Sequence, residues 1–222
     1  MINEALIGLS LMTSVNLTQI PIVSQSAIFV EERTLAKEEL KLTDRLADKY
    51  GNEVFSDNIL LSLHYLKGDV NSVKKSQKVN SAEDIDWEKV RKPFEVSFEL
   101  KPGETFAFHN KELPEIKDSV VKSTNSKFIT TEGYKVFAGL GGNGVCHIAS
   151  LVNMTSKKGG LEVISKVNHD FYPIPDVPRE YGTSIFSDSE DQNLYIKNNL
   201  ERNVNFVFKI TENKVILEIK EK

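Results

Sequence analysis

A glycine-rich stretch constrains the fold more than any other feature of the sequence. Residues 139–144 read Gly-Leu-Gly-Gly-Asn-Gly, so four of the six positions are glycine. Such a run favours neither a helix nor a stable strand, because glycine loses more conformational entropy on folding than any other residue. It predicts a tight loop whose backbone other atoms can approach closely. Whether those atoms belong to a ligand or the loop is only a tight turn stays open at this stage.

A helix is expected to follow this loop, beginning near Gly144 and ending at the Lys-Lys-Gly-Gly of residues 157–160, where basic residues and glycine suit a helix C-terminus. Its core positions would be Val145, Ile148, Ala149 and Val152. Cys146 then lies in the first turn, where the helix dipole lowers the pKa of a thiol. The backbone N–H groups at 144–147 would be placed to hold an oxyanion. Cys146 is therefore a candidate nucleophile, and the alternative is a small buried hydrophobic residue.

A thiolate nucleophile needs a histidine close to it in space. Residues 160–171 are expected to form a strand that returns over the helix, with His169 at its far end as the base. His147 suits that role less, because adjacent helical residues point about 100° apart. For the orienting acid we select Asp176, with Glu180 and Asp188 as alternatives, while Asp170 would point to the opposite face of the strand.

This order of cysteine and histidine resembles that of the transglutaminase-like and papain-like cysteine enzymes. A metal bound by Cys146, His147 and His169 is a third option, but the spacing fits no familiar metal site. We therefore expect neither a metal nor a cofactor.

The residues around the helix alternate between apolar and polar, which is typical of half-buried strands. Residues 94–100 and 105–108 are expected to pair as a hairpin around the turn Lys101–Glu104, followed by a long surface loop at 111–130. Further strands are expected at 193–198, 204–210 and 215–219. The predicted fold class is α+β, with an antiparallel sheet, a central helix after the glycine-rich loop and a transglutaminase-like layout.

The first ninety residues look mostly helical. A helix is expected over 31–50, capped by Thr34 and stopped by Gly51, and a short helix over 86–90 with Trp87 as its apolar anchor. Residues 58–66 are apolar enough to be buried, but their pattern fits a helix or a strand. The predicted organisation is a signal or N-terminal segment at 1–26, a helical region at 27–92 and an α+β domain at 93–222.

Composition excludes several classes of function. The formal charge of −4 and the pI near 5.7 argue against nucleic acid as a partner. A single cysteine excludes an internal disulfide. Residues 5–23 are mostly apolar but are interrupted by polar side chains, so no transmembrane helix is expected. Small residues at 24–27 have the spacing of a cleavage site, although the only early charge is Glu4, so export and retention are both open.

Several motifs together resemble the VanW-like family. They are Leu-Lys-Pro-Gly-Glu-Thr-Phe-Ala-Phe at 100–108, Gly-Gly-Asn-Gly-Val-Cys-His at 141–147, Gly-Leu-Glu-Val at 160–163, Asn-His at 168–169 and Asn-Leu-Tyr-Ile-Lys-Asn at 193–198. The resemblance extends over about residues 94–210 and has no counterpart in 1–90. Two positions depart from the family pattern. His147 stands where the family has glutamine, and the loop Pro178–Gly182 lacks the aspartate of the family's Pro-Gly-x-Asp-Ala loop.

The resemblance implies the bacterial cell envelope and gene sets for resistance to glycopeptide antibiotics such as vancomycin. The protein is then expected outside the cytoplasm or at the cell surface, and otherwise in the cytoplasm. Two functions fit. One is a cysteine-dependent acyl transfer or hydrolysis at peptide or amide bonds of peptidoglycan. The other is a non-catalytic module that binds wall peptide or a partner protein. The oligomeric state is left open. The expected binding residues are Gly142, Asn143, Gly144, His147, Arg179 and Tyr181.

Overall fold

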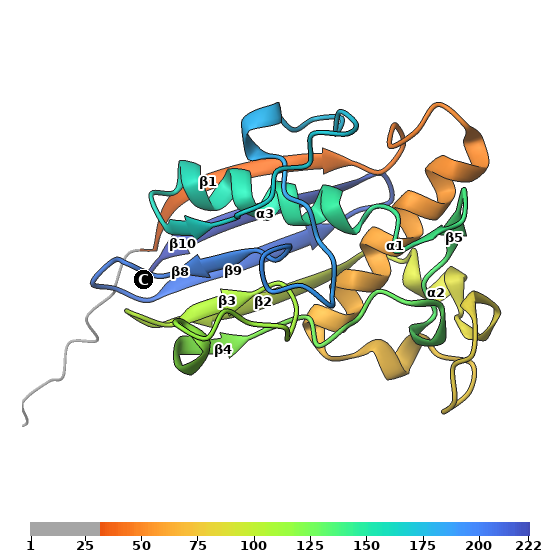
Figure 1. Ribbon diagram of the computed structural model, residues 1–222, viewed down its shortest axis with the longest axis horizontal. Helices are drawn as coiled ribbons and strands as arrows, with labels where there is room; N and C mark the ends of the chain where they lie inside the picture. The colour runs from red at the N-terminus through yellow and green to blue at the C-terminus, as the bar shows by residue number, and fades with distance from the viewer. Residues whose placement is uncertain (1–31) are drawn as a thin grey trace, which may run out of the picture. The chain divides into compact units, whose positions relative to one another are not determined.

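The computed structural model describes residues 32–222, which lie in one compact unit. The expected signal or N-terminal segment at 1–26 lies outside the described residues. The main elements are β1 (Arg33–Lys41), α1 (Lys49–Lys67), α2 (Trp87–Val90), β2 (Phe94–Leu100), β3 (Thr105–Ala107), β4 (Val120–Lys122), β5 (Val136–Phe137), β6 (Leu140–Gly141), α3 (Val145–Lys158), β7 (Glu162–Ile164), β8 (Tyr195–Lys197), β9 (Val204–Ile210) and β10 (Lys214–Glu221). Figure 1 shows their arrangement.

The larger sheet is antiparallel and has the order β1-β10-β9-β2. Its register pairs Val96 of β2 with Phe208 of β9, and Phe208 in turn with Leu217 of β10. All three side chains are buried, as their alternating pattern predicts for residues that share one face of a sheet. The strands expected at 94–100, 204–210 and 215–219 are confirmed.

The helix expected over 31–50 is wrong. Residues 33–41 form β1, which pairs along its length with β10, and α1 begins only at Lys49. The segment is rich in good helix formers, but pairing with an unoccupied sheet edge outweighs local propensity. Gly51 does not stop a helix but lies inside α1. A Cβ atom there would come within 2.5 Å of Leu46 and 2.9 Å of Phe137, so close packing explains the glycine.

The smaller sheet has the order β4-β3-β8-β7, with β3 and β4 parallel and the other pairs antiparallel. The expected hairpin between 94–100 and 105–108 is therefore wrong, because β2 pairs with β9 while β3 pairs with β8 and β4. The turn Lys101–Glu104 carries the chain from one sheet to the other. All three residues of β3 are buried, and Phe106 stacks on Phe98 of the larger sheet with ring centroids 5.1 Å apart.

Two helices position the glycine-rich loop. The helix α3 packs against β1, β10 and α1, and its start and end agree with the prediction from the sequence (Figure 1). The helix α1 is capped at its start by Asp48, whose carboxylate accepts the Gly51 N–H, and at its end by Gly68, which has φ +82°. It contains residues 58–66, whose helix-or-strand ambiguity is thereby resolved. The short helix expected at 86–90 is confirmed as α2.

The fold class is confirmed at the level of a mixed α/β protein with antiparallel sheets and few helices. The transglutaminase-like layout and a helical N-terminal region are not seen: β1 stands where helix was expected, and the larger sheet takes strands from both sides of residue 93. Two further segments, one predicted as a strand and one as a loop, also differ from expectation. Only Glu162–Ile164 of 160–171 forms a strand, and the segment 111–130 contains β4 and buries Thr124 and Phe128.

Candidate functional site

The glycines before α3 are required by the protein's own backbone. Gly144 has φ +97°, and a Cβ atom there would lie 2.3 Å from the carbonyl oxygen of Phe55 in α1. Gly142 has φ +69°, and its Cβ atom would lie 3.0 Å from the Phe128 carbonyl oxygen. The close approach expected from the sequence therefore exists, but α1 and the loop at Phe128 make it. The binding roles of Gly142 and Gly144 stay predictions.

Asn143 fixes the loop against its neighbours. Its side-chain Oδ1 accepts the Phe137 N–H at 3.0 Å, and its backbone oxygen accepts the amide of Asn58 at 3.0 Å. The first N–H groups of α3 are also partly used, because those of Val145 and His147 donate to Gly142 and Gly144. The N–H groups of Val145 and His147 are therefore already hydrogen-bonded in this conformation, whereas the expected oxyanion site needs free N–H groups.

The Cys146 thiol lies beside Ile185. The Ile185 N–H donates to Sγ at 3.4 Å, and Sγ is 4.0 Å from the Ile185 oxygen. The residue is half-buried, but desolvation of its thiol raises the pKa from its ordinary 9.0 to about 11, and the hydrogen bond from Ile185 opposes this only in part. The expected lowering of the pKa is therefore wrong, because desolvation of the thiolate outweighs the field of the helix N-terminus.

We expect slow alkylation of Cys146 by iodoacetamide at neutral pH. A pKa near 11 leaves about a hundredfold less thiolate than the ordinary pKa of 9.0, and the thiolate is the reacting species. The rate should rise with pH until about 11. Mass spectrometry of the intact protein measures it, with a small-molecule thiol as reference. A rate at neutral pH equal to or above that of the reference would contradict the raised pKa and restore the nucleophile hypothesis.

His147 and His169 face each other. Their rings are 6.2 Å apart between centroids and nearly perpendicular. His169 Nδ1 is 3.0 Å from the Tyr172 carbonyl oxygen, which can only accept, so Nδ1 carries the proton and Nε2 is an acceptor. Burial lowers the pKa of both residues, that of His147 to about 3, with Arg45 and His169 contributing. The imidazole that the structure brings to His169 is therefore His147, and no hydrogen bond joins Cys146 to His169 within the described residues.

Asp176 forms an ion pair with Arg45, whereas the sequence predicted that it orients His169. Its carboxylate accepts from the Lys41 N–H at 3.0 Å and forms an ion pair with Arg45, whose side chain is fully buried. Arg45 also donates to the Pro175 oxygen at 3.1 Å. Asp176 itself has φ +68°, so this contact holds the loop in a conformation that costs a non-glycine residue. The catalytic assignment of Cys146, His169 and Asp176 stays a prediction.

A row of five rings crosses the start of α3, and we call it the aromatic row. Successive ring centroids are 4.0 Å apart for Phe171 and His169, 6.2 Å for His169 and His147, 5.0 Å for His147 and Phe55, and 6.4 Å for Phe55 and Phe137. The row is buried at its centre and surfaces at Phe171, which is 76% exposed. His147 Nδ1 has no hydrogen-bond partner among the described residues. Exposed aromatic rings that rest on a packed base are typical of binding surfaces.

A cavity of about 300 Å³ opens beside the exposed end of the row. Ile174 and Val177 supply buried apolar surface, while Asp170 and Arg179 form an exposed ion pair with Nε and Oδ1 3.2 Å apart. Its lining residues are His169, Asp170, Tyr172, Pro173, Ile174, Val177, Pro178, Arg179 and Gly182. The expected binding residue Arg179 therefore borders the cavity. Tyr181 lies apart from the lining, with the ammonium groups of Lys157 and Lys158 each 5.9 Å from its ring.

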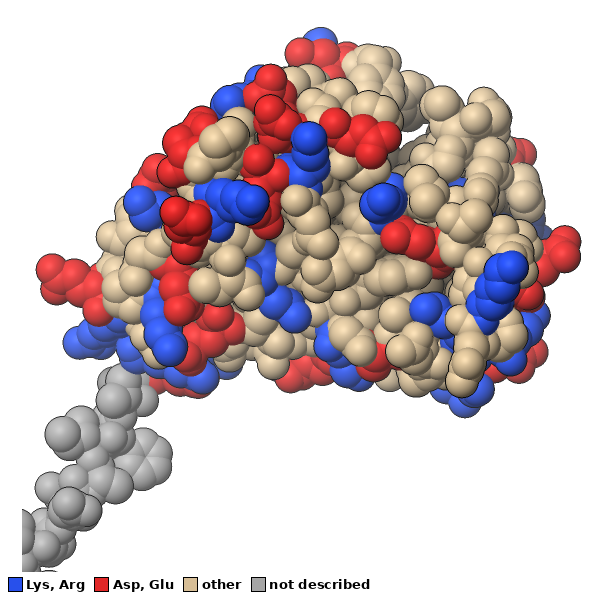
Figure 2. Space-filling model, turned by 60° about the horizontal axis from the view of Figure 1, so that its bottom comes forward, with Lys and Arg blue, Asp and Glu red and all other residues tan. Residues whose placement is uncertain are grey.

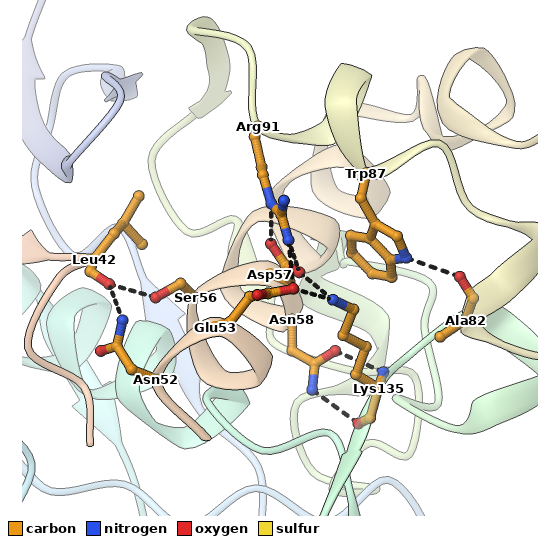
Figure 3. A network of polar contacts seen from close by, with 10 residues as sticks. All are labelled: Leu42, Asn52, Glu53, Ser56, Asp57, Asn58, Ala82, Trp87, Arg91 and Lys135. Carbon is orange, nitrogen blue, oxygen red and sulfur yellow. Dashed lines mark hydrogen bonds and ion pairs between the residues drawn. The ribbon is translucent and has the colours of Figure 1, made fainter. Parts of the chain in front are cut away.

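A buried network of charges holds α1 in place (Figure 3). Asp57, 2% exposed, accepts from Arg91 at 2.7 and 2.8 Å and from Lys135 at 2.5 Å. The Lys135 ammonium lies 4.6 Å from the Trp87 ring centroid. Asn58 completes the link, because its side chain bonds the Lys135 N–H and oxygen at 2.8 and 3.0 Å. The network joins α1, α2 and β5 behind the glycine-rich loop.

No group of three or more His, Cys, Asp or Glu side chains in residues 32–222 is placed to hold a metal ion. Within the same residues, no helix combines the length and hydrophobicity that crossing a membrane requires. On the face in Figure 2, basic and acidic side chains are interspersed.

Sequence reasoning missed Arg45, Phe55 and Phe137. Arg45 was part of the expected helix over 31–50, where an arginine would be solvated, and no local signal marks it as buried. Phe55 and Phe137 are ordinary core residues by sequence, and only tertiary packing joins them to His147. The one available hint in the sequence is that Phe137 lies two residues before the glycine-rich loop. The approach of Phe55 to Gly144 is visible only in the structure.

The comparison with known families agrees with the resemblance seen in the sequence. The family described as "VanW like protein" matches residues 97–220, which is more than half of the chain. No curated protein and no solved structure matches the chain.

Proposed function

Because the chain belongs to the VanW-like family, we propose that it is a non-catalytic peptide-binding module of the bacterial cell envelope. The ligand would lie in the cavity beside His169, with an apolar side chain against Phe171. The observation that carries this proposal is the cavity of about 300 Å³ lined in part by His169, on whose ring the exposed Phe171 ring rests with centroids 4.0 Å apart. A ring in that setting has a rigid base and a free face.

The chemistry of the cavity favours a short peptide. Ile174 and Val177 offer apolar contact, and the Arg179 guanidinium at the rim can pair with a ligand carboxylate in place of Asp170. A concave site with an apolar floor and few polar groups is typical of small-ligand binding. Wall peptide is the ligand class that the family resemblance implies, and its terminal carboxylate suits Arg179.

Calorimetric titration with a synthetic pentapeptide ending in D-alanyl-D-alanine tests the proposal. We expect saturable binding, and about tenfold weaker binding for Phe171→Ala, because loss of one aromatic anchor costs on the order of 1.4 kcal/mol. Arg179→Ala should weaken binding in a salt-dependent way. Phe171 is exposed, so its truncation should leave the folded state intact, which circular dichroism checks.

The matched control is Phe186→Ala, which removes another half-exposed aromatic ring outside the aromatic row and the cavity lining. It should bind like the unchanged protein. The proposal fails if the pentapeptide does not bind, or if Phe171→Ala and Phe186→Ala bind it equally well.

A cysteine-dependent acyl transfer or hydrolysis, with a transglutaminase-like or papain-like use of Cys146, His169 and Asp176, stays the alternative. The Ile185 N–H directed at the sulfur is the contact that favours a thiolate. Cys146→Ala separates the two hypotheses, because the binding module keeps its affinity for the peptide while an enzyme loses turnover.

A further inference from the structure

A second cavity, of about 450 Å³, lies away from the peptide site between α1, α2 and β5. Its volume is within the range of about 300–1,000 Å³ that small-molecule sites occupy. It is lined by Tyr50, Ser81, Ala82, Glu83, Trp87, Thr130, Tyr134, Lys135 and Val136. Nothing in the family resemblance concerns most of these residues, because Tyr50 to Trp87 precede the matched segment.

The floor of this cavity is rigid. The Trp87 indole N–H donates to the Ala82 oxygen at 2.8 Å, which fixes the plane of the ring. The Lys135 ammonium lies 4.6 Å from the centre of that ring, and both backbone polar groups of Lys135 are bonded to Asn58 (Figure 3). A ligand would meet a surface that is already ordered, so little entropy would be lost in the protein on binding.

The charge of the cavity disfavours an anionic ligand. Lys135, the cation in the lining, is already paired with Asp57 at 2.5 Å and Glu53 at 2.9 Å. Glu83 adds an exposed carboxylate at the rim. A phosphate or carboxylate would therefore meet a neutralised cation and a negative charge.

The remaining groups suit a molecule that is apolar on one face and rich in hydroxyl groups at its edges. Tyr50 is 60% exposed, so its ring offers a free stacking face. The Glu83 carboxylate and the Thr130 hydroxyl have no side-chain partner within residues 32–222. The carboxylate can accept from ligand hydroxyl groups, and the hydroxyl can both accept from them and donate to them. A purely apolar ligand would form no hydrogen bond with either group.

We infer that this cavity binds a neutral saccharide, which stacks the C–H face of a sugar ring on Tyr50 beside Trp87 and hydrogen-bonds to Glu83 and Thr130. The inference does not rest on the proposed peptide-binding function, because the two cavities share no lining residue.

Trp87 is the only tryptophan in the chain, so its fluorescence reports on this cavity without labelling. Titration of the full chain with chitotriose and with cellotriose, two neutral oligomers whose rings have flat C–H faces, should give a saturable change in emission. Tyr50→Ala should weaken binding by about tenfold through loss of the stacking face. Glu83→Gln and Thr130→Ala should each weaken it several-fold.

Phe186→Ala, an exposed ring outside the cavity, is the matched control and should bind both sugars like the unchanged protein. Tyr50 is exposed, so the Tyr50→Ala protein should keep its thermal midpoint. The inference is overturned if neither sugar changes the Trp87 emission, if the change does not saturate, or if Tyr50→Ala binds as well as Phe186→Ala.

Discussion

Gly144→Ala should lower the free energy of unfolding by roughly 3–5 kcal/mol. Two costs add at this position. The residue has φ +97°, and its Cβ atom would lie 2.3 Å from the Phe55 carbonyl oxygen and 3.0 Å from its carbonyl carbon. Those atoms belong to the backbone of α1, so they cannot move aside as a flexible side chain would. The loss is a large fraction of the roughly 5–15 kcal/mol that stabilises a typical domain. Urea denaturation followed by Trp87 fluorescence measures it.

Gly160→Ala is the matched control for this substitution. Gly160, which follows α3, is also in the left-handed region, with φ +79°, but no heavy atom lies within 4 Å of its added Cβ atom. It should lose only about 1 kcal/mol from backbone strain. Equal losses for the two variants would mean that α1 does not approach the glycine-rich loop as closely as described.

Asp57→Ala should cost about 3 kcal/mol of unfolding free energy. Asp57 is buried and accepts from both Arg91 and Lys135, and the Lys135 side chain is itself 14% exposed. Removing the carboxylate leaves Lys135 shielded from water beside the Trp87 ring with only Glu53 to pair with it. A cation held away from water without full compensation is costly. Thermal and urea unfolding both measure the change.

Glu53→Ala tests whether burial causes this effect. Glu53 pairs with the same two cations at 2.7 and 2.9 Å, but its side chain is 48% exposed. Its loss should cost below about 1 kcal/mol, as for other exposed ion pairs. If Glu53→Ala destabilises the protein as much as Asp57→Ala, the network is stabilised by its total charge and not by the buried carboxylate.

The elements predicted correctly from the sequence are those in which the order of apolar and polar residues reflects which side of the element is buried. Strands β2, β9 and β10 each have one buried face, so their residues alternate. The helix α3 has an apolar stripe and a Lys-Lys-Gly-Gly end. By contrast, β1 consists of helix-forming residues and is a strand only because β10 offers it an edge. The turn Lys101–Glu104 could be predicted because its signal lies in adjacent residues. The partner strands of β3 could not, because they are set by the packing of β3 between the two sheets.

The candidate site was predicted less well, because its chemistry depends on burial and on side-chain direction. The sequence correctly placed Cys146 in the first turn of a helix, but the pKa of a thiol there depends on whether water reaches it. The sequence also disfavoured His147 as a partner of Cys146, but it is the His147 ring that faces His169 in the structure. The pairing of Arg45 with Asp176 joins residues 131 positions apart, which no local pattern encodes.

The strand order β1-β10-β9-β2 means that the segment matched by the family, residues 97–220, is shorter than the folded unit. A polypeptide cut to residues 97–220 would lack β1, all of α1 and α2, and the beginning of β2, although it would retain nearly all of β10. The hydrogen-bonding groups along one side of β10 would then face water, as a template on which another chain could assemble. The strand β1, which lies upstream of the matched segment, covers this edge of β10 and so hinders the pairing of β10 with another chain.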